Sequence, residues 1–348
     1  MRFAFFVNDL ATEYPNYATT VLAHAAAVRG HEVCYVTPSG FVLSADDSLA
    51  VHGHFVPKKK YGTHLEFFEA LKKVGKKAKK MDVSEIDVLM LRNDPSTDAQ
   101  TTPWAEDIGI LFGREAARRG VLVLNDPDAL GRAINKLYFQ SFPAEVRAET
   151  MITKNANDVK EFAEAHGGNI ILKPLQGSGG SGVFKVDSKS GSNLNQIIEA
   201  IDRDGYIIAQ SYVKAASKGD IRMFMMNGWP LKIGDKYCAM RRVASEDDIR
   251  SNIHAGGKAE AVEITDVELK VAELIRPRLI ADGMFLVGVD IVGDKILEVN
   301  VFSPGNLNTC NKMAGVNFAV PIIESIERKI EIRDENLVGF PNKTLATM

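Results

Sequence analysis

The sequence predicts an α/β protein of two or three domains, with a parallel sheet at its N-terminal end. Three observations lead to this prediction. Strand-like apolar segments alternate with helix-like segments through residues 1–126, a glycine-dense loop joins two further strands, and a late hairpin alternates aliphatic with polar side chains. The chain has 348 residues, a length that exceeds what one hydrophobic core usually supports. Its hydrophobic content of 45% is ample to fill several cores.

The N-terminal segments follow the order that a parallel α/β domain requires. Helices are expected at 17–29 and 103–119, and the strand-like runs are RFAFFV at 2–7, HEVCYVTP at 31–38, VLMLRND at 88–94 and VLVLND at 121–126. Ligands of such sheets gather at the carboxyl ends of the strands. We therefore expect substrate contacts from the polar residues at these ends, which are Asn8, Asp9, Arg92 and Asp94.

Domain boundaries are expected near residues 126, 212 and 332. The Asn-Asp-Pro sequence at 125–127 predicts a turn that closes a first domain at 1–126 and precedes a helix carrying Arg132, Asn135 and Lys136. Residues 127–212 are then expected to form a small α/β domain with the glycine-dense loop. A larger mixed sheet with the hairpin is expected in 213–332, followed by a loosely ordered polar tail at 333–348.

Composition excludes several classes of protein. The formal net charge of −3 excludes a strongly basic nucleic-acid binder, while small anionic ligands stay open because local clusters bind them. The apolar run at the N-terminus is too short for a signal peptide, and no stretch approaches the ~20 apolar residues of a membrane span. We expect a cytoplasmic protein. Cys34, Cys238 and Cys310 are expected to be reduced and buried, and the lysine-rich segments 57–62 and 72–80 to be solvated surface.

The hairpin FLVGVDIVGDKILEVNV at 285–301 carries Asp290, Glu298 and Asn300. Its period of two predicts that the aliphatic side chains enter a core and that the polar side chains share the outward face. If the turn has three residues, Asp290 lies directly opposite Glu298. Mg²⁺ uses a few carboxylate and amide oxygens of this kind and leaves the remaining positions to water and substrate phosphate. The alternative is an edge hairpin with solvated acids, which is the commoner structure.

The segment ILKPLQGSGGSGVFKV at 171–186 predicts a strand, a glycine-dense loop and a second strand. The glycines allow backbone N–H groups to approach phosphate oxygens, and Lys173 adds a positive charge just before the loop. In a P-loop the lysine follows the glycines and the loop enters a helix, so this segment is a different kind of phosphate-binding flap. The alternative is a hairpin tip without a ligand.

These features occur together with several longer motifs: LRNDPS at 91–96, NDPDALGRAINKLY at 125–138, IIAQSYVKAASKGDIRMFMMNG at 207–228, RSNIHAGGKAE at 250–260 and GVDIVGDKILEVNVFSP at 288–304. With these residues the chain resembles the ATP-grasp ligases, and more narrowly the bacterial glutathione synthetases, over nearly its whole length. The resemblance implies an ATP-grasp fold with an N-terminal parallel α/β (pre-ATP-grasp) domain, a small lid domain that carries the flap, and a larger C-terminal domain with a mixed sheet.

The resemblance also implies a role for each candidate site residue. ATP is expected on Lys136, Lys173, Gly177, Ser178, Gly179, Gly180, Ser181 and Gly182, with adenine near Gln210, Tyr212 and Val213 and the ribose on Asp220. Mg²⁺, or Mn²⁺ in its place, is expected on Asp290, Glu298 and Asn300. The catalytic cations are expected to be Arg222, Arg241 and Arg250, and the substrate contacts Arg92, Asp94, Asn252, Gly256, Gly257 and Ser303.

The reaction implied by the resemblance is attack of a substrate carboxylate on the γ-phosphate of ATP, followed by displacement of phosphate from the acyl phosphate by an amine. The segments GNLNTCNKMAGVNF at 305–318 and VASEDDI at 243–249 depart from the bacterial enzymes, so γ-glutamylcysteine and glycine are one expected pair among related donors and acceptors. Two alternatives stay open: a ligase that adds amino acids to a protein or small peptide, and a nucleotide-binding regulatory protein without turnover. The resemblance further implies a homodimer or homotetramer with small-molecule substrates.

Overall fold

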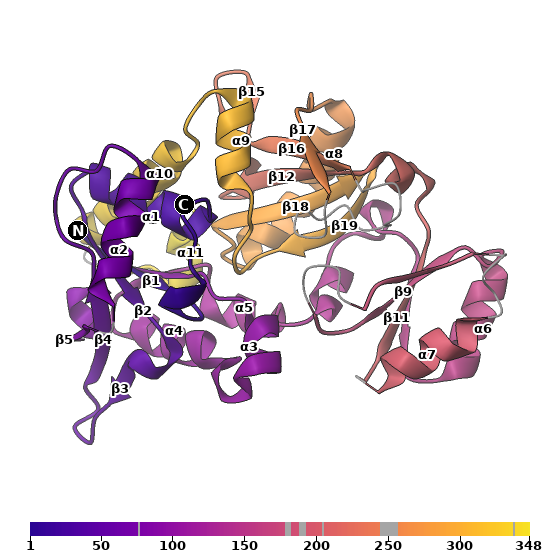
Figure 1. Ribbon diagram of the computed structural model, residues 1–348, viewed down its shortest axis with the longest axis horizontal. Coiled ribbons are helices and arrows are strands. Elements are labelled where there is room, and N and C mark those ends of the chain that lie inside the picture. The colour runs from indigo at the N-terminus through magenta and orange to yellow at the C-terminus, as the bar shows by residue number, and fades with distance from the viewer. Residues whose placement is uncertain (76, 178–181, 188–192, 204, 244–256, 337) are drawn as a thin grey trace.

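The computed structural model describes residues 1–75, 77–177, 182–187, 193–203, 205–243, 257–336 and 338–348. Three lobes follow one another across Figure 1, each built around its own sheet. The first lobe lies at the left with both chain ends, the lobe with β12, β16, β18 and β19 lies in the middle, and the lobe with β9 and β11 lies at the right (Figure 1).

The sheet of the first lobe has the strand order β3-β4-β2-β1-β6-β7, with β5 paired to β4. Its strands are β1 (Arg2–Phe6), β2 (Glu32–Val36), β3 (Phe41–Leu43), β4 (Leu49–Phe55), β5 (Lys79–Asp82), β6 (Val88–Leu91) and β7 (Leu122–Leu124). The expected parallel pairing is confirmed for β2, β1, β6 and β7. The strands β3, β4 and β5 pair antiparallel, and the short connection between β3 and β4 leaves no room for a parallel crossover.

The helices of the first lobe are α1 (Ala18–Val28), α2 (His64–Val74), α3 (Pro95–Thr101), α4 (Ile108–Arg118) and α5 (Pro127–Arg132), with short 3₁₀ turns at Leu10–Thr12, Pro38–Gly40, Val83–Glu85 and Pro103–Ala105. The helix predicted at 17–29 is confirmed. The helix predicted at 103–119 begins only at Ile108, since Pro103–Ala105 forms a separate 3₁₀ turn.

The helix after residue 127 is shorter than predicted. It ends at Arg132, and Asn135 caps a new 3₁₀ helix, Lys136–Ser141, by accepting a hydrogen bond from the Leu137 N–H. Lys136 therefore begins a second element and does not lie on the predicted helix. A further 3₁₀ turn, Ala144–Val146, precedes the first strand of the right-hand lobe.

The right-hand lobe is an antiparallel sheet with the order β10-β9-β11-β8. Its elements are β8 (Thr150–Thr153), α6 (Ala156–Ala165), β9 (Ile170–Pro174), β10 (Phe184–Val186), α7 (Leu194–Asp202) and β11 (Ile207–Ser211). Apolar side chains of α6 and α7 form one core with those of β9 and β11, including Phe162, Ile170, Leu172 and Ile198. The strand–loop–strand arrangement predicted for 171–186 is confirmed by the β9–β10 pairing.

The middle lobe has the strand order β17-β16-β12-β18-β19, with β13 on β12. Its elements are β12 (Asp220–Met226), β13 (Trp229–Pro230), β14 (Lys232–Ile233), β15 (Lys236–Tyr237), β16 (Ala239–Val243), β17 (Lys258–Glu260), α8 (Asp266–Ala281), β18 (Leu286–Val292), β19 (Lys295–Asn300) and α9 (Leu307–Ala314), preceded by a 3₁₀ turn at Lys214–Lys218. Helix α8 packs its apolar side chains, such as Val271 and Ile275, with those of the strands.

The hairpin of β18 and β19 places Asp290 directly opposite Glu298, as predicted, but its turn differs from the predicted three-residue turn. Val292 pairs with Lys295 and Ile291 with Ile296, so the turn has two residues rather than three. A register shift after Asp290 leaves Leu297 as an extra residue, and this bulge restores the alignment of the two carboxylates.

The C-terminal segment returns to the first lobe, where α10 (Ala319–Glu335) and α11 (Asn342–Leu345) lie beside α1 and β7 (Figure 1). The Asn342 side chain bonds both the N–H and the C=O of Val123, and Leu345 and Ala346 are buried. The prediction of a loosely ordered tail at 333–348 is therefore wrong. Leu345 and Ala346 lie in the core of a lobe whose first strand begins at Arg2, more than 300 residues earlier, which local polarity does not show.

The three cysteines are buried and unpaired, which confirms the prediction for their burial. Within the described ranges, no helix combines the length and apolar character needed to cross a bilayer.

The packing of the C-terminal segment gives a testable prediction. Leu345→Ala should lower the free energy of unfolding by about 2–5 kcal/mol, because it opens a cavity in a packed core. Val338→Ala is the matched control, since the Val338 side chain is 84% exposed. Denaturant unfolding followed by tryptophan fluorescence measures both changes, and equal stability of the two variants would contradict the packing.

Candidate active site between the lobes

Two polar side chains of the first lobe hold the segment that follows β19. The Asn125 amide donates to the C=O groups of Leu286 and Val301 and accepts from the Leu286 N–H. The Arg92 guanidinium donates to the C=O groups of Phe302 (3.2 Å) and Pro304 (3.3 Å). Both side chains are buried, so the end of β19 has a fixed position relative to the first lobe.

Arg92 was predicted to contact substrate, but here it donates to these two backbone carbonyls and to the Thr19 hydroxyl at 3.4 Å. Burial lowers the pKa of Arg92 to about 10, and the nearby Glu13 carboxylate acts in the opposite direction. Ser303, between the two bonded carbonyls, is exposed. These contacts favour Ser303 over Arg92 as the residue that is open to a ligand.

Asp290 lies in a buried ion network with an arginine of the adjacent strand β12 and an arginine of β16, the strand beyond it. Arg222 donates two hydrogen bonds to its carboxylate, and Arg242 lies 2.7 Å from Oδ2. Arg242 also pairs with Asp220 at 2.5 Å. Burial acts to raise the pKa of Asp290, but the two guanidinium groups outweigh burial and hold that pKa below its ordinary value. The alternative of an edge hairpin with solvated acids therefore does not hold for Asp290, which is 2% exposed.

The register of β16 separates its two arginines. Arg242 pairs with Asp220 across the strands and Arg241 pairs with Ile221, and adjacent residues of a strand point to opposite faces. Arg242, which the sequence analysis did not select, therefore shares the face of Arg222 and Asp290. Arg241 points to the other face. A strand register was needed to distinguish them, since two consecutive arginines carry no local signal.

The two predicted phosphate-binding lysines lie near Glu298. Burial lowers the pKa of Lys173 to about 8, the Glu298 carboxylate raises it, and Lys136 lowers it further. Burial also lowers the pKa of Lys136, against the charges of Glu298 and Asp94. Lys136 lies in the linker, the segment between the first lobe and the right-hand lobe. Lys173 lies in β9 of the right-hand lobe, which corresponds to the predicted lid, and Glu298 lies in β19 of the middle lobe. The charges of three separate parts of the chain therefore act on one another.

Neighbouring groups of the lid hold these lysines in position. The Lys136 ammonium donates to the C=O of Gly177 at 2.6 Å, and Gly177 has a φ of +117°, which favours glycine. Lys173 donates to the side chain of Gln210 at 3.2 Å, which in turn donates to Thr150. Lys136 thus joins the start of the flap to the linker, and Lys173 is tied to the strand predicted to border adenine.

The remaining ATP-binding candidates lie around the same strand. Gln210 is buried in β11. Tyr212 lies just after this strand, with the Lys185 ammonium 4.3 Å from the centre of its ring. Val213 is the N-cap residue of the 3₁₀ turn that follows. Asp220 lies at the start of β12 in the network with Arg242. Gly182 ends the flap with a φ of +68°. The predicted residues Ser178, Gly179, Gly180 and Ser181 lie outside the described residues.

Besides Arg92 and Ser303, the predicted substrate contacts within the described chain are Asp94 and Gly257. Asp94 exchanges backbone hydrogen bonds with the Asn8 side chain at 2.8 and 2.9 Å, at the carboxyl ends of β6 and β1 as expected. Gly257 directly precedes β17. The candidates Arg250, Asn252 and Gly256 lie outside the described residues.

The donors near Glu298 fit a hard divalent cation. Glu298 and Asn300 are half-buried, and within the described chain Glu298 forms no hydrogen bond or ion pair. The Asn300 amide donates to Asp290, which leaves its oxygen available. Asp290 is largely occupied by arginines, and no three acidic, histidine or cysteine side chains gather as a metal group among the described residues. Such a set requires substrate phosphate to complete the coordination.

The comparisons with known proteins agree with this geometry. Residues 1–131 match the family described as "Prokaryotic glutathione synthetase, N-terminal domain", and residues 135–315 match "Prokaryotic glutathione synthetase, ATP-grasp domain". The chain is 30% identical to glutathione synthetase of Vibrio parahaemolyticus over 305 residues, covering 87% of this chain and 90% of that one. It is 31% identical to glutathione synthetase of Agrobacterium fabrum over 319 residues, covering 91% and 93%.

Solved structures show the same fold at low sequence identity. D-cycloserine synthetase DcsG has a TM-score of 0.62 at 15% identity and covers 94% of this chain and 99% of that one. The ATP-grasp ligase PsnB, solved with a minimal precursor, Mg and ADP, has a TM-score of 0.58 at 16% identity and covers 94% and 98%. With both of its family domains matched in order, the chain belongs to the prokaryotic glutathione synthetase family of ATP-grasp, ADP-forming carbon–nitrogen ligases.

Proposed function

We propose that this chain joins a peptide carboxylate to an amine at the expense of ATP, with γ-glutamylcysteine and glycine, or a closely related pair, as substrates. The observation that carries the proposal is the meeting of Lys136, Lys173 and Glu298 from three parts of the chain. Two partly buried ammonium groups beside a carboxylate that suits a metal ion match a triphosphate. Relatives of 30% and 31% identity named glutathione synthetase support the choice of substrates.

The proposed reaction begins when the donor carboxylate attacks the γ-phosphorus and the bond to ADP breaks. Lys136 and Lys173 neutralise phosphate oxygens as charge shifts to the leaving ADP, and positioning of this kind supplies most of the rate effect in phosphoryl transfer. Glu298 and Asn300, with any lone pair left on Asp290, are the residues that would hold Mg²⁺ or Mn²⁺. A divalent cation held there would supply positive charge that neutralises the phosphate oxygens.

The second step is attack of the amine on the acyl phosphate, which releases phosphate and leaves an amide. Acyl phosphates hydrolyse readily, so water has to be excluded until the amine arrives. The lid sheet and its flap suit this task, because the Lys136 hydrogen bond to Gly177 attaches the flap to the reaction site.

Arg222 and Arg242 have a positioning role in this proposal. They share the charge of Asp290 and fix its direction beside Glu298. Arg241 points to the face of the sheet opposite Asp290. It could act in the reaction only if substrate contacted that face. Arg250 keeps its predicted role. We further propose that the enzyme works in the cytoplasm, and as a homodimer or homotetramer.

Removal of the Glu298 charge should abolish turnover without unfolding the protein. Glu298→Gln keeps the shape of the side chain but weakens both cation binding and the field on the lysines. The assay is ADP and phosphate release with γ-glutamylcysteine and glycine, with product mass as a second readout. Asp294→Asn, in the exposed turn of the same hairpin, is the control and should retain activity. Near-normal ADP release by the Glu298 variant would contradict its assignment.

The affinity for ATP should fall as the pH rises through about 8. The ammonium form of Lys173 binds phosphate, burial lowers its pKa to about 8, and the neutral amine that forms above this pH offers no charge. Lys173→Arg stays charged, so its affinity should be nearly constant between about pH 7 and 9.5. Calorimetric titration with ATP measures both, and parallel pH profiles for the two proteins would exclude Lys173 as the titrating group.

Arg242→Ala should lower the free energy of unfolding by about 3–5 kcal/mol, because it removes a guanidinium group shared by two buried carboxylates. Arg241→Ala, one position earlier on the same strand, should lower it by about 1 kcal/mol or less. Denaturant unfolding of both variants tests the assignment of the two arginines to opposite faces. Equal losses of stability would show that the register is wrong.

A further inference from the structure

The first lobe contains a cavity that is separate from the lysine site. Its volume is about 640 Å³, within the range of small-molecule sites. Its polar lining includes Asp9, Glu13, His54 and Lys72, and Phe68 and Trp104 are among its apolar residues. Neither the two lysines nor the acids of the hairpin line it.

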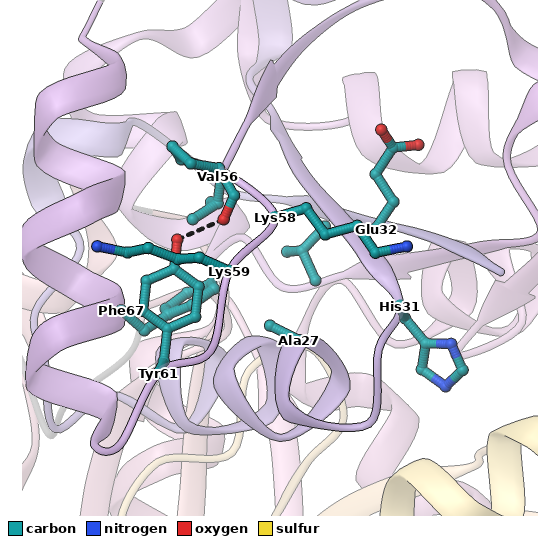
Figure 2. Close-up of a pocket in the computed structure, with 10 residues that line it drawn as sticks. Ala27, His31, Glu32, Val56, Lys58, Lys59, Tyr61 and Phe67 are labelled. Atoms are coloured by element: carbon teal, nitrogen blue, oxygen red, sulfur yellow. Dashed lines mark hydrogen bonds between the residues drawn. The ribbon is translucent and has the colours of Figure 1, made fainter.

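A second hollow of this lobe, between Ala27, Val56, Tyr61 and Phe67 (Figure 2), measures only about 10 Å³. Tyr61 closes it by donating a hydrogen bond to the Pro57 carbonyl, drawn as the dashed line in Figure 2. This hollow has room for about one water molecule at most. The large cavity is therefore the ligand-sized space of the two.

The topology of the lobe also points to the large cavity. The chain leaves β1 to form β2 on one side and later forms β6 on the other side of β1. This reversal is a topological switch point, where open α/β sheets bind ligands beyond the carboxyl ends of their strands. The cavity is lined by the residues that follow β1 (8–11 and Glu13) and β2 (37–39), and by α3 residue Asp98.

Glu13 provides a second and independent indication of a ligand. Its side chain lines the cavity although the residue is only 7% exposed. Thr20 donates to one carboxylate oxygen at 3.3 Å, and among the described residues no cation lies within ion-pair distance. Burial raises the pKa of Glu13 to about 7, against the more distant charge of Arg92. A buried carboxylate without an ion pair is costly, and such groups occur mostly at functional sites.

The cavity also has basic groups in its wall. Lys72 extends over the Phe68 ring at 5.4 Å, which places its ammonium group beside the cavity lining. One ring nitrogen of His54 is bonded to the Gly75 carbonyl at 3.1 Å, so its other nitrogen is left for a ligand. Carboxylates and basic groups around one space match a molecule that carries both an ammonium group and a carboxylate.

The cavity is connected to the reaction site through Asn8. Asn8 lines the cavity, and its side chain forms two hydrogen bonds with the Asp94 backbone. The Asp94 charge in turn acts on Lys136. Asn8 and Asp94 therefore lie between the cavity and Lys136, and a donor that uses both places has to extend past these two residues.

We propose that this cavity binds the end of the peptide donor remote from its reacting carboxylate, an α-amino acid group whose ammonium is bound by Glu13 and whose carboxylate lies toward Lys72 and His54. This inference rests on the proposed function and adds the part of the protein that selects the donor. It requires a donor with a free α-amino acid at its far end, as a γ-glutamyl dipeptide has.

The test compares two donors that differ only in the ammonium group, γ-glutamylcysteine and its des-amino analogue glutarylcysteine. In Glu13→Gln, the kcat/KM for γ-glutamylcysteine should fall about 10-fold to 100-fold, the range of one hydrogen bond to a charged group. The kcat/KM for glutarylcysteine and the KM for ATP should change by about 2-fold or less. Loss of activity toward both donors to the same extent, or toward neither, would overturn the proposal.

Matched variants guard against a structural effect of the buried Glu13. Ser39→Trp narrows the cavity from an exposed lining position and should raise the KM for γ-glutamylcysteine without changing that for ATP. Lys72→Ala should do the same, whereas Lys73→Ala and Glu69→Gln, on the same helix but outside the lining, should match the unmodified protein. Normal donor KM values in both Ser39→Trp and Lys72→Ala would contradict the site.

A binding experiment separates this inference from the proposed function. Calorimetric titration of γ-glutamylcysteine into the full chain, without ATP, should show binding that Glu13→Gln weakens by the same factor. If no donor gives ADP but this binding is seen, the proposed function fails and the cavity assignment stands. If ADP forms while the dipeptide binds both proteins equally, the cavity assignment fails alone. Absence of both binding and ADP release overturns the two together.

Discussion

The sharing of one buried carboxylate by two guanidinium groups is the constraint on which the site depends. Asp290 lies on the inner strand β18 with almost no access to water. Its charge is tolerable there only because Arg222 approaches from the adjacent strand β12 and Arg242 from β16, the strand beyond it. Those contacts in turn require the pairing of β12 with β16 and β18. Burying these charges costs desolvation energy, so the network adds little net stability. Its effect is to fix the orientation of the Asp290 carboxylate opposite Glu298.

The network also explains why Gly288 and the bulge at Leu297 are needed. A side chain at Gly288 would meet Pro304 at 2.9 Å and Arg222 at 3.1 Å, so only glycine allows the post-β19 segment and the arginine to pass each other. The bulge then aligns Glu298 with Asp290. Asn125 and Arg92 hold the segment from outside, which connects the geometry of the hairpin to the first lobe.

Much of this arrangement followed from local sequence, and the failures have a common cause. Alternating aliphatic residues predicted the hairpin and the opposition of Asp290 and Glu298, and the glycine-dense segment predicted a strand–loop–strand flap. Local periodicity does not identify what lies across a sheet, so it did not show that two arginines bury Asp290 and did not distinguish Arg242 from Arg241. Lys136 was placed on a helix that ends at Arg132, because a capping Asn135 three residues later carries a weaker signal than amphipathic spacing.

The same limit applies to Glu13 and to the C-terminal residues. A single glutamate after an N-terminal strand reads as surface charge until the cavity around it is known. Leu345 and Ala346 lie in a polar stretch, and their burial depends on β7 and α8, which are far away in sequence. Contacts of this range follow from the assembled fold and not from the pattern of neighbouring residues.

The return of α10 and α11 to the first lobe has a consequence for how the protein can be dissected. That lobe is discontinuous: its core contains Leu22 and Phe67 from one end of the chain and Ile322, Ile326 and Leu345 from the other. A fragment cut after residue 131, where the first family match stops, would leave a broad apolar surface uncovered and invite aggregation. Separate expression of this half would require grafting residues 316–348 onto it, for instance by circular permutation.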